Sequence, residues 1–163
     1  MTLVVITSIR GYAVKSIRTL IGATALAVAI VGAMSVPAVA EVQENIQTFK
    51  NLDTGLCLDD TPEGGLRTFT CNNTVPQKFR VRSDGRIVEL RSERTKLCVD
   101  DTREANIRHW TCNNTDAQRW SVTRYPDKSI SFRNLDTGLC MDDTREAGLR
   151  HFVCNGTPAQ RWV

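Results

Sequence analysis

The chain has 163 residues and a formal net charge of +3 at pH 7. The basic excess lies in residues 1–40, which hold Arg10, Lys15 and Arg18 and no acidic residue. Without them, the count of Lys and Arg falls from 21 to 18 and equals the 18 Asp and Glu. Residues 41–163 are therefore close to neutral, which argues against nucleic acid as the partner, because that ligand needs a positive protein face.

Residues 1–40 have the pattern of a secretory signal peptide. The basic residues precede an almost wholly apolar run over residues 20–34, and small residues at 38–40 spell A-x-A before Glu41. This order of segments is typical of an exported protein. The alternative is a retained membrane anchor, but the apolar run is shorter than the ~20 residues that a bilayer span needs. We therefore predict a secreted, extracellular protein with no membrane span in the mature chain.

The rest of the chain contains one segment three times, and the copies align without gaps. Cys57, Cys98 and Cys140, at the same place in the three copies, lie 41 and then 42 residues apart. A fixed period near forty marks a repeat architecture, and three equal copies within one small domain predict threefold pseudo-symmetry. We expect one domain over residues 41–163, with lobes at about 46–82, 83–124 and 125–163.

In chain order, residues 41–47 form a polar lead-in, and the first lobe then opens with turn residues at 51–55. Each lobe continues with a short strand, a polar loop, a second strand, a turn and a final strand at the end of the copy. Residues 83–86 and 125–128 are predicted hairpin turns. No helical period of useful length follows residue 40. Four short antiparallel strands in each lobe predict an all-β barrel or sandwich of twelve strands, and three equal lobes favour a β-trefoil.

All six cysteines lie in the repeats, two in each copy and 14 residues apart within it. An even number of cysteines in an exported chain implies disulfides. Because equivalent lobes should form equivalent bonds, we predict the pairs Cys57–Cys71, Cys98–Cys112 and Cys140–Cys154. Zinc is the alternative, but the sequence has no C-x-x-C and no cysteine or histidine cluster with ligand spacing. We expect no metal and no cofactor.

Each copy begins with a motif of the form C-[LVM]-D and ends with Gln-x-aromatic. With these two motifs at a fixed period, residues from about 44 to 163 resemble the ricin-type (R-type) lectin β-trefoil and its Q-x-W signature. The resemblance implies a carbohydrate-binding module whose Q-x-W aromatic packs in the shared core. The chain departs from the signature at Phe79, and it ends one residue after the last motif, so we expect a short closing strand. The signature residues are Gln77, Phe79, Gln118, Trp120, Gln160 and Trp162.

Three pairs of adjacent acids first suggest a glycosidase. Neighbouring residues of a strand point to opposite faces, so a pair such as Asp59 and Asp60 cannot flank one glycosidic bond as acid and nucleophile. His109 and His151 occupy equivalent positions in two lobes, and no serine or cysteine nucleophile is matched with a base. Catalytic sites are rarely built in triplicate, whereas binding sites often are. We therefore expect no enzyme activity.

The same residue types suit a sugar, which presents hydroxyl groups and an apolar C–H face. An ionised carboxylate accepts hydrogen bonds from two hydroxyls, and an aromatic ring covers the apolar face. By resemblance, the first aspartate of each pair binds hydroxyls, and the aromatic two residues before the second cysteine is the stacking platform. These residues are Asp59, Asp100 and Asp142, and Phe69, Trp110 and Phe152. The alternatives are turn or cap roles for these acids and core packing for the rings. The second aspartates, Asp60, Asp101 and Asp143, are expected to serve the loop.

Two positions depart from the family pattern. The residue before the motif glutamine, often Asn in the family, is Pro76, Ala117 or Ala159. The residue two before the ring, often Gln in the family, is Arg67, Arg108 or Arg150. An arginine there can donate to a sugar carboxylate or sulfate, or it can only neutralise the neighbouring aspartate. We count Arg108 and Arg150 among the candidate carbohydrate-binding residues.

Taken together, these patterns predict a secreted, monomeric, disulfide-bonded lectin-like module with up to three sugar sites and a polysaccharide or glycan as its partner. The alternative is a β-trefoil interaction or inhibitor module that uses its loops on a protein and has lost sugar binding. The missing Asn and Gln favour that alternative, whereas the aspartate and aromatic pair in all three lobes favours the lectin.

Overall fold

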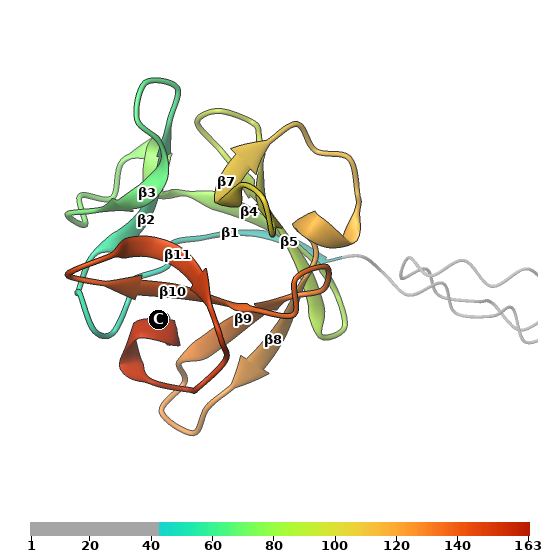
Figure 1. Ribbon diagram of the computed structural model, residues 1–163. Helices are drawn as coiled ribbons and strands as arrows, with labels where there is room; N and C mark the ends of the chain where they lie inside the picture. Colours follow the sequence, from blue (N-terminus) through green and yellow to red (C-terminus); the bar gives the residue numbers. More distant parts are fainter. Residues whose placement is uncertain (1–42) are drawn as a thin grey trace, which may run out of the picture. The chain divides into compact units, whose positions relative to one another are not determined.

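The computed structural model describes residues 43–163, and the predicted signal peptide lies outside the described residues (Figure 1). Eleven β-strands and three short 3-10 turns follow one another there, without an α-helix in this part of the chain. All strand pairs are antiparallel. Within residues 43–163 we find no helix that is long and apolar enough to cross a membrane.

Each lobe contains one hairpin of two five-residue strands, which is followed by a 3-10 turn. A barrel strand comes next in the first two lobes, and isolated bridges at Trp162 take its place in the third. The strands are β1 (Gln43–Gln47), β2 (Cys57–Thr61), β3 (Gly65–Phe69), β4 (Phe79–Asp84), β5 (Ile87–Ser92), β6 (Cys98–Thr102), β7 (Asn106–Trp110), β8 (Trp120–Arg124), β9 (Ile130–Asn134), β10 (Cys140–Thr144) and β11 (Gly148–Phe152). The 3-10 turns are η1 (Val75–Gln77), η2 (Asp116–Gln118) and η3 (Pro158–Gln160).

The barrel is built from the strands that connect successive lobes. The pairs β4–β5 and β8–β9 are hairpins whose turns follow Asp84 and Arg124, so both predicted hairpin turns are present. β5 pairs with β8, and Trp162 bridges to Asn51 and Ile130, which brings the third lobe back to the first. The second strands of the three lobe hairpins, β3, β7 and β11, contact one another in pairs, and Figure 1 shows β2–β3 and β10–β11 lying side by side.

The aromatic residue that ends each copy lies in the shared core. Phe79, Trp120 and Trp162 are fully buried. The ring of Phe49 lies 6.3 Å from that of Phe79 and 5.2 Å, edge-on, from that of Phe132, so it packs beside the one position where tryptophan is replaced by the smaller phenylalanine. Burying a side chain of this size stabilises a fold by about 1.5–3 kcal/mol. The other core residues are Leu58, Val81, Val88, Leu90, Val99 and Met141.

Two local predictions are wrong. Residues 43–47 of the lead-in form β1, which pairs with β4 along its whole length. β4 has one free edge after pairing with β5, and the lead-in satisfies the backbone groups of that edge. The motif glutamines lie in the 3-10 turns, and the strands that follow begin only at the aromatic residue. Proline near the start of η1 and η3 favours this helical backbone. The short closing strand that we expected is reduced to the bridges of Trp162.

One disulfide closes each lobe, and the pairs are Cys57–Cys71, Cys98–Cys112 and Cys140–Cys154. The first cysteine begins the hairpin and the second follows it, so the bridge ties the loop beyond the hairpin to the hairpin's first strand. Closing a loop of about 15 residues contributes about 3 kcal/mol in the chain-entropy model. No cysteine among residues 43–163 is free, so none is available as a zinc thiolate.

The second aspartate of each pair joins its lobe to the next one. Asp101 is fully buried; its Oδ2 accepts a hydrogen bond from Thr137 Oγ1 at 2.5 Å, and its Oδ1 accepts one from His151 Nδ1 at 2.6 Å. Both partners belong to the third lobe. The equivalent contacts are those of Asp60 with Thr95 and His109, and of Asp143 with Thr54 and Thr68. Together these lobe-to-lobe contacts close a ring through all three lobes.

These aspartates were expected to serve a loop, and the turn that each one binds opens the next lobe. Strand alternation turns Asp101 away from the face of Asp100, and the next lobe covers the face that it reaches. The third contact differs in chemistry, because Thr68 stands where the other lobes have histidine. Burial raises the pKa of the Asp143 carboxyl, and hydrogen bonds from Thr54 and Thr68 offset this in part.

Candidate functional site

The hairpin β6–β7 shows how each lobe builds its candidate site. Cys98 lies opposite Trp110, and Asp100 lies opposite Arg108. Directly opposed residues share a face, and alternate residues of a strand return to it. Asp100, Arg108 and Trp110 therefore share one face with the disulfide, and we call this trio ring site 2. Ring site 1 consists of Asp59, Arg67 and Phe69, and ring site 3 consists of Asp142, Arg150 and Phe152.

The carboxylate of each ring site is buried behind its arginine. Asp100 is 2% exposed; its Oδ1 accepts a hydrogen bond from Arg108 Nε at 2.9 Å, and its Oδ2 accepts one from Gln118 Nε2 at 3.2 Å. The Nε–Oδ1 distances in ring sites 1 and 3 are 3.2 Å and 2.8 Å. The salt bridge that the sequence left open is thus present in every lobe. Each of these carboxylates therefore accepts hydrogen bonds from two side chains of the protein, the arginine and the motif glutamine.

The aromatic ring of each site lies on the surface, not in the core. Phe69, Trp110 and Phe152 are 45%, 50% and 42% exposed. In ring site 2 the Cζ atom of Arg108 lies 4.4 Å from the ring centroid, and the distances in ring sites 1 and 3 are 4.9 Å and 4.5 Å. A guanidinium over a ring face is a cation–π contact. It fixes the arginine, while about half of each aromatic residue stays open to a ligand.

The glutamine of each Q-x-W motif holds the loop that follows the ring. Gln118 is fully buried, and its Oε1 accepts a hydrogen bond from the backbone N–H of Asn113 at 2.8 Å. Its Nε2 donates to the carbonyl of Thr111 at 2.9 Å and to Asp100. One side chain therefore connects the loop, the hairpin and the buried carboxylate. Gln77 and Gln160 make the same three kinds of contact.

Sequence reasoning missed a second cation beside each ring. Arg91 in β5 pairs with Cys98, which pairs with Trp110, so these residues form one row across three strands and share a face. Strands about 4.8 Å apart place the backbones of Arg91 and Trp110 about 10 Å apart. The equivalent residues are Lys50 and Arg133, and all three side chains are exposed. We call them the lateral cations. They recur at the spacing of the repeat, before the first cysteine of each copy, but only the register of the folded sheet brings them to the rings.

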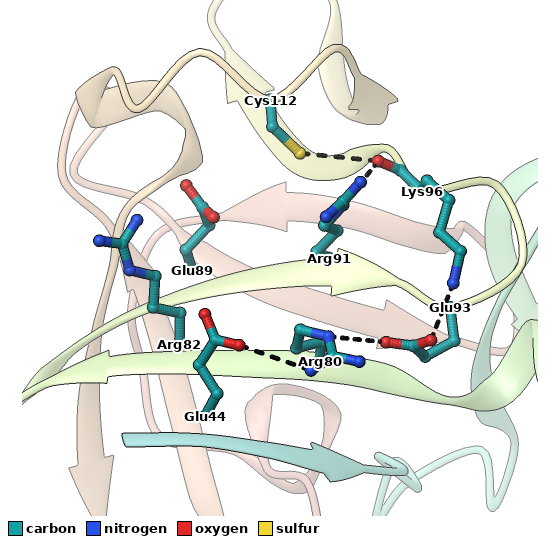
Figure 2. Close-up of a pocket in the computed structure, with 8 residues that line it drawn as sticks. All are labelled: Glu44, Arg80, Arg82, Glu89, Arg91, Glu93, Lys96 and Cys112. Atoms are coloured by element: carbon teal, nitrogen blue, oxygen red, sulfur yellow. Dashed lines mark hydrogen bonds and ion pairs between the residues drawn. The ribbon is translucent and has the colours of Figure 1, made fainter. Parts of the chain in front are cut away.

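A hollow of about 540 Å³ lies on the Arg91 side of ring site 2 (Figure 2). Figure 2 shows the Arg91 guanidinium and the Cys112 sulfur meeting at the Lys96 carbonyl, so the hollow reaches the disulfide of the second lobe. Its walls carry both signs of charge. Glu93 accepts hydrogen bonds from Lys96 and Arg80, and these two cations lower the pKa of its carboxyl. The remaining lining residues are Glu44, Arg82 and Glu89.

Ring site 1 is the loosest of the three. Its ion pair and its guanidinium-to-ring contact are the longest. The cause lies in the hairpin loop, where Gly64 stands at the position of Ala105 and Ala147. A Cβ atom on Gly64 would lie 2.5 Å from Nη1 of Arg67. The guanidinium of Arg67 therefore occupies space that an alanine side chain fills in the other lobes.

The acids of these sites are buried, whereas the rings and cations are at least partly exposed. Asp100 is bound within its own lobe and Asp101 is bound by the next lobe, so both carboxylates of a pair are buried and already hydrogen-bonded. Across residues 43–163 there is no group of three His, Cys, Asp or Glu side chains that could hold a metal ion. What reaches the surface in each lobe is a ring and two cations.

The chain belongs to the ricin-type β-trefoil lectin domain family, because the sequence model of that family matches residues 45–162. The match covers nearly all of the described residues. It confirms the predicted family, the all-β class and the β-trefoil fold. No curated protein sequence gives a significant match to this chain.

Solved structures share the fold at low sequence identity. ThreeFoil, a designed threefold-symmetric protein, is 14% identical with a TM-score of 0.66, over 72% of this chain and 95% of its own. The hemolytic lectin CEL-III is 23% identical with a TM-score of 0.62, over 72% of this chain and 29% of its own. The Polyporus squamosus lectin, solved bound to Neu5Aca2-6Galb1-4GlcNAc, is 10% identical with a TM-score of 0.63, over 74% and 48%. The chain thus spans less than half of each of these two lectins, and at these identities the likeness shows the fold alone.

Proposed function

We propose that residues 41–163 form a secreted, monomeric carbohydrate-binding module with up to three sugar sites and no catalytic activity. The observation that carries this proposal is the exposed aromatic ring that recurs on the same face of three equivalent hairpins. A half-open ring beside hydrogen-bonding groups matches the apolar face and the hydroxyls of a sugar. Membership of a lectin family and the fold shared with two named lectins support the same function.

The absence of catalysis is proposed from the placement of the acids. A glycosidase needs two carboxyl groups that face the substrate about 5–9.5 Å apart. Asp100 and Asp101 are both buried, lie on opposite faces of one strand and are hydrogen-bonded by the protein itself. The other two pairs repeat this arrangement. None of them supports acid–base chemistry on a bound sugar.

A glycan array with the exported protein tests the function. We expect at least one class of glycan to bind and the variant Trp110→Ala to bind it less, because the largest of the three exposed rings is removed. Ile46→Ala is the matched control, since it removes an exposed apolar side chain on β1, outside the ring sites. Absence of binding to every glycan, or equal loss in the two variants, would overturn the proposal.

The buried ring-site carboxylates also favour a second candidate, a β-trefoil interaction module that has lost sugar binding. In that case the rings and cations would be a patch for a protein. This candidate predicts that no glycan on the array binds. It also predicts that a protein partner still binds after its glycans are removed, and that Trp110→Ala weakens this binding. Binding of free oligosaccharides decides against it.

A further inference from the structure

We propose that the ring sites select acidic sugars, whose carboxylate or sulfate group is bound by the two cations beside each ring. The inference rests on the proposed function and names its substrate class. It follows from which charged groups of each site reach the surface and which do not.

The arginine of each ring site has unused donors. A guanidinium group carries five N–H donors in a fixed fork. Arg108 donates from Nε to Asp100, and among residues 43–163 no other side-chain hydrogen bond is found for it, nor for Arg67 or Arg150 beyond the same Nε bond. Their side chains are 43%, 35% and 32% exposed in ring sites 1, 2 and 3. The Nη atoms are therefore open to an oxyanion, which a guanidinium binds through two parallel hydrogen bonds.

The negative charge of each site is placed away from the ligand. Asp100 is 2% exposed, and both its oxygens already accept hydrogen bonds from the protein. A carboxylate in this position orients the arginine, but it offers little acceptor capacity to sugar hydroxyls. The charged atoms beside the exposed ring are therefore those of arginine, which favours an acceptor-rich, negatively charged ligand.

The lateral cation adds a second positive group on the same face. Arg91 donates from Nε to the Lys96 carbonyl at 2.9 Å, and Arg133 makes the same bond with the Gly138 carbonyl at 3.0 Å. Both bonds fix the side chain while leaving its Nη atoms available. Each ring thus has an arginine over its face and another cation in the same row of strands, about 10 Å away by strand spacing. This arrangement suits a polysaccharide that carries an acidic group on successive sugar units.

Ring site 2 has the strongest combination. Trp110 offers the largest ring, and the hollow of Figure 2, lined by Arg91, Arg82 and Cys112, lies on the Arg91 side of the site. In that hollow, Glu93 pairs with Lys96 and Arg80, and Glu44 also pairs with Arg80. Glu89 lines the hollow as well, so the cations there outnumber the acids by four to three. We therefore expect the second lobe to carry most of the preference for acidic sugars.

Two pairs of polysaccharides with matched backbones test the inference. Polygalacturonate and its methyl ester differ in the carboxylate, and dextran sulfate and dextran differ in the sulfate. The exported protein is titrated onto each immobilised polymer at physiological ionic strength, where distant charges are screened. We expect at least one charged polymer to bind at least about tenfold more tightly than its neutral match, the range for hydrogen bonds to charged groups. A difference within the polygalacturonate pair identifies carboxylate as the bound group, and a difference within the dextran pair identifies sulfate.

Three variants locate the effect. Arg108→Gln removes the fork beside Trp110, and Arg91→Gln removes the lateral cation without touching the buried Asp100. Each should lower binding of the charged polymer by about tenfold. Arg124→Gln changes the net charge equally at the end of β8, outside the ring sites and the hollow, and should lower binding less than twofold, about the level of a screened surface charge. Arg91→Gln keeps the test valid if Arg108→Gln does not fold.

The outcomes distinguish a failure of this inference from a failure of the proposed carbohydrate binding. Equal binding of charged and neutral polymers overturns the preference for acidic sugars and leaves the lectin function in place. Equal losses in Arg124→Gln and the two site variants also overturn it, because they indicate unspecific ion exchange. Binding of no glycan at all overturns both.

Discussion

At the scale of single residues, the three copies of the motif act as a set of natural substitutions. Gly64 in the first copy corresponds to Ala105 and Ala147. Gly64→Ala should move the Arg67 guanidinium off the loop and toward Phe69, because the new Cβ would lie 2.5 Å from Nη1. The alanine also restricts the unfolded chain, so we expect the free energy of unfolding to rise by about 0.4–1 kcal/mol. Urea denaturation measures it.

The neighbouring glycine is the control for this prediction. Gly65 has a φ of +65°, in the left-handed region, so Gly65→Ala should cost about 1–2 kcal/mol even though nothing lies within 4 Å of its added Cβ. A loss of stability in both variants would show that Gly64 is retained for its backbone and not for the space that Arg67 fills.

Asp143 gives the fold a pH dependence with a definite sign. Burial raises the pKa of its carboxyl above the ordinary 3.8, so the folded state holds the proton more tightly than the unfolded state. The stability from this group is present below the unfolded pKa and is lost as pH rises through the folded pKa. Asp143→Asn has no charge to bury, and Thr54 and Thr68 hydroxyls can donate or accept. We therefore expect its free energy of unfolding to gain on the wild type as pH rises above 3.8.

Unfolding by urea at several pH values measures this gain, with Asp101→Asn as the comparison. That variant weakens a buried contact with His151, and we expect a loss of about 1.5–3 kcal/mol at neutral pH, as for hydrogen bonds to charged groups. Parallel pH curves for the wild type and Asp143→Asn would refute the assignment of the pH dependence to Asp143.

At the scale of elements, the buried glutamine of each Q-x-W motif joins a hairpin to its 3-10 turn. Gln118→Ala would leave the carbonyl of Thr111, the N–H of Asn113 and one oxygen of Asp100 without this partner. Of these contacts only the one with Asp100 is fully buried. An unpaired buried polar group costs about 1–3 kcal/mol, and we expect the variant to lose that amount. Thermal and urea unfolding give the value.

Arg119→Ala provides the matched control one residue further along. Arg119 is partly exposed and pairs with Asp116 across three residues at the surface, an interaction worth at most about 1 kcal/mol. If Gln118→Ala were no more damaging than Arg119→Ala, the glutamine would not have the structural role that its three contacts indicate.

The elements also show which features the sequence could predict. Strand alternation separated Asp100 from Asp101, and the equal spacing of Cys98 and Cys112 pointed to a bridge within the lobe, because both arguments are local. The partner of Asp101 lies in the next lobe, 36 and 50 residues away, and no local pattern contains it. The repeat marks Arg91 as the equivalent of Lys50 and Arg133, but only the sheet register shows that it lies in one row with Trp110.

β1 was missed for a related reason. Its residues look polar in the sequence because only their pairing with β4, more than thirty residues away, gives them a structure. The threefold repeat, in contrast, predicted the all-β trefoil correctly, since a repeat fixes the number and equivalence of the lobes before any contact is known.

At the scale of the whole molecule, three equivalent sites on one rigid domain predict avidity. A single exposed ring with one arginine should bind a monosaccharide weakly, but a polysaccharide that reaches two or three sites can bind about 10²–10⁴ times more tightly. Trp110→Ala should therefore weaken binding to immobilised polysaccharide far more than binding to the free monosaccharide. Calorimetry and a polysaccharide-coated sensor give the two affinities. Circular dichroism and melting must first show that the variant is folded.

Loss of the fold in Trp110→Ala would favour a core role for this ring, despite its 50% exposure. Unchanged polysaccharide binding in a folded variant would remove ring site 2 from the binding surface. Equal losses for the monosaccharide and the polysaccharide would argue that only one site is active.

The central claim, that sugars bind at the exposed rings of three hairpins, is tested most directly by an NMR titration of residues 41–163 with the best-binding glycan. The indole N–H signals of Trp110 and Trp120 provide an internal comparison. Trp110 is exposed at ring site 2, whereas Trp120 is fully buried and donates to the Val99 carbonyl. We predict shifts for the Trp110 indole and for the amides of Phe69 and Phe152, with the Trp120 indole unchanged. Shifts confined to other surfaces, such as the β8–β9 hairpin, with the Trp110 signal unmoved, would contradict the claim.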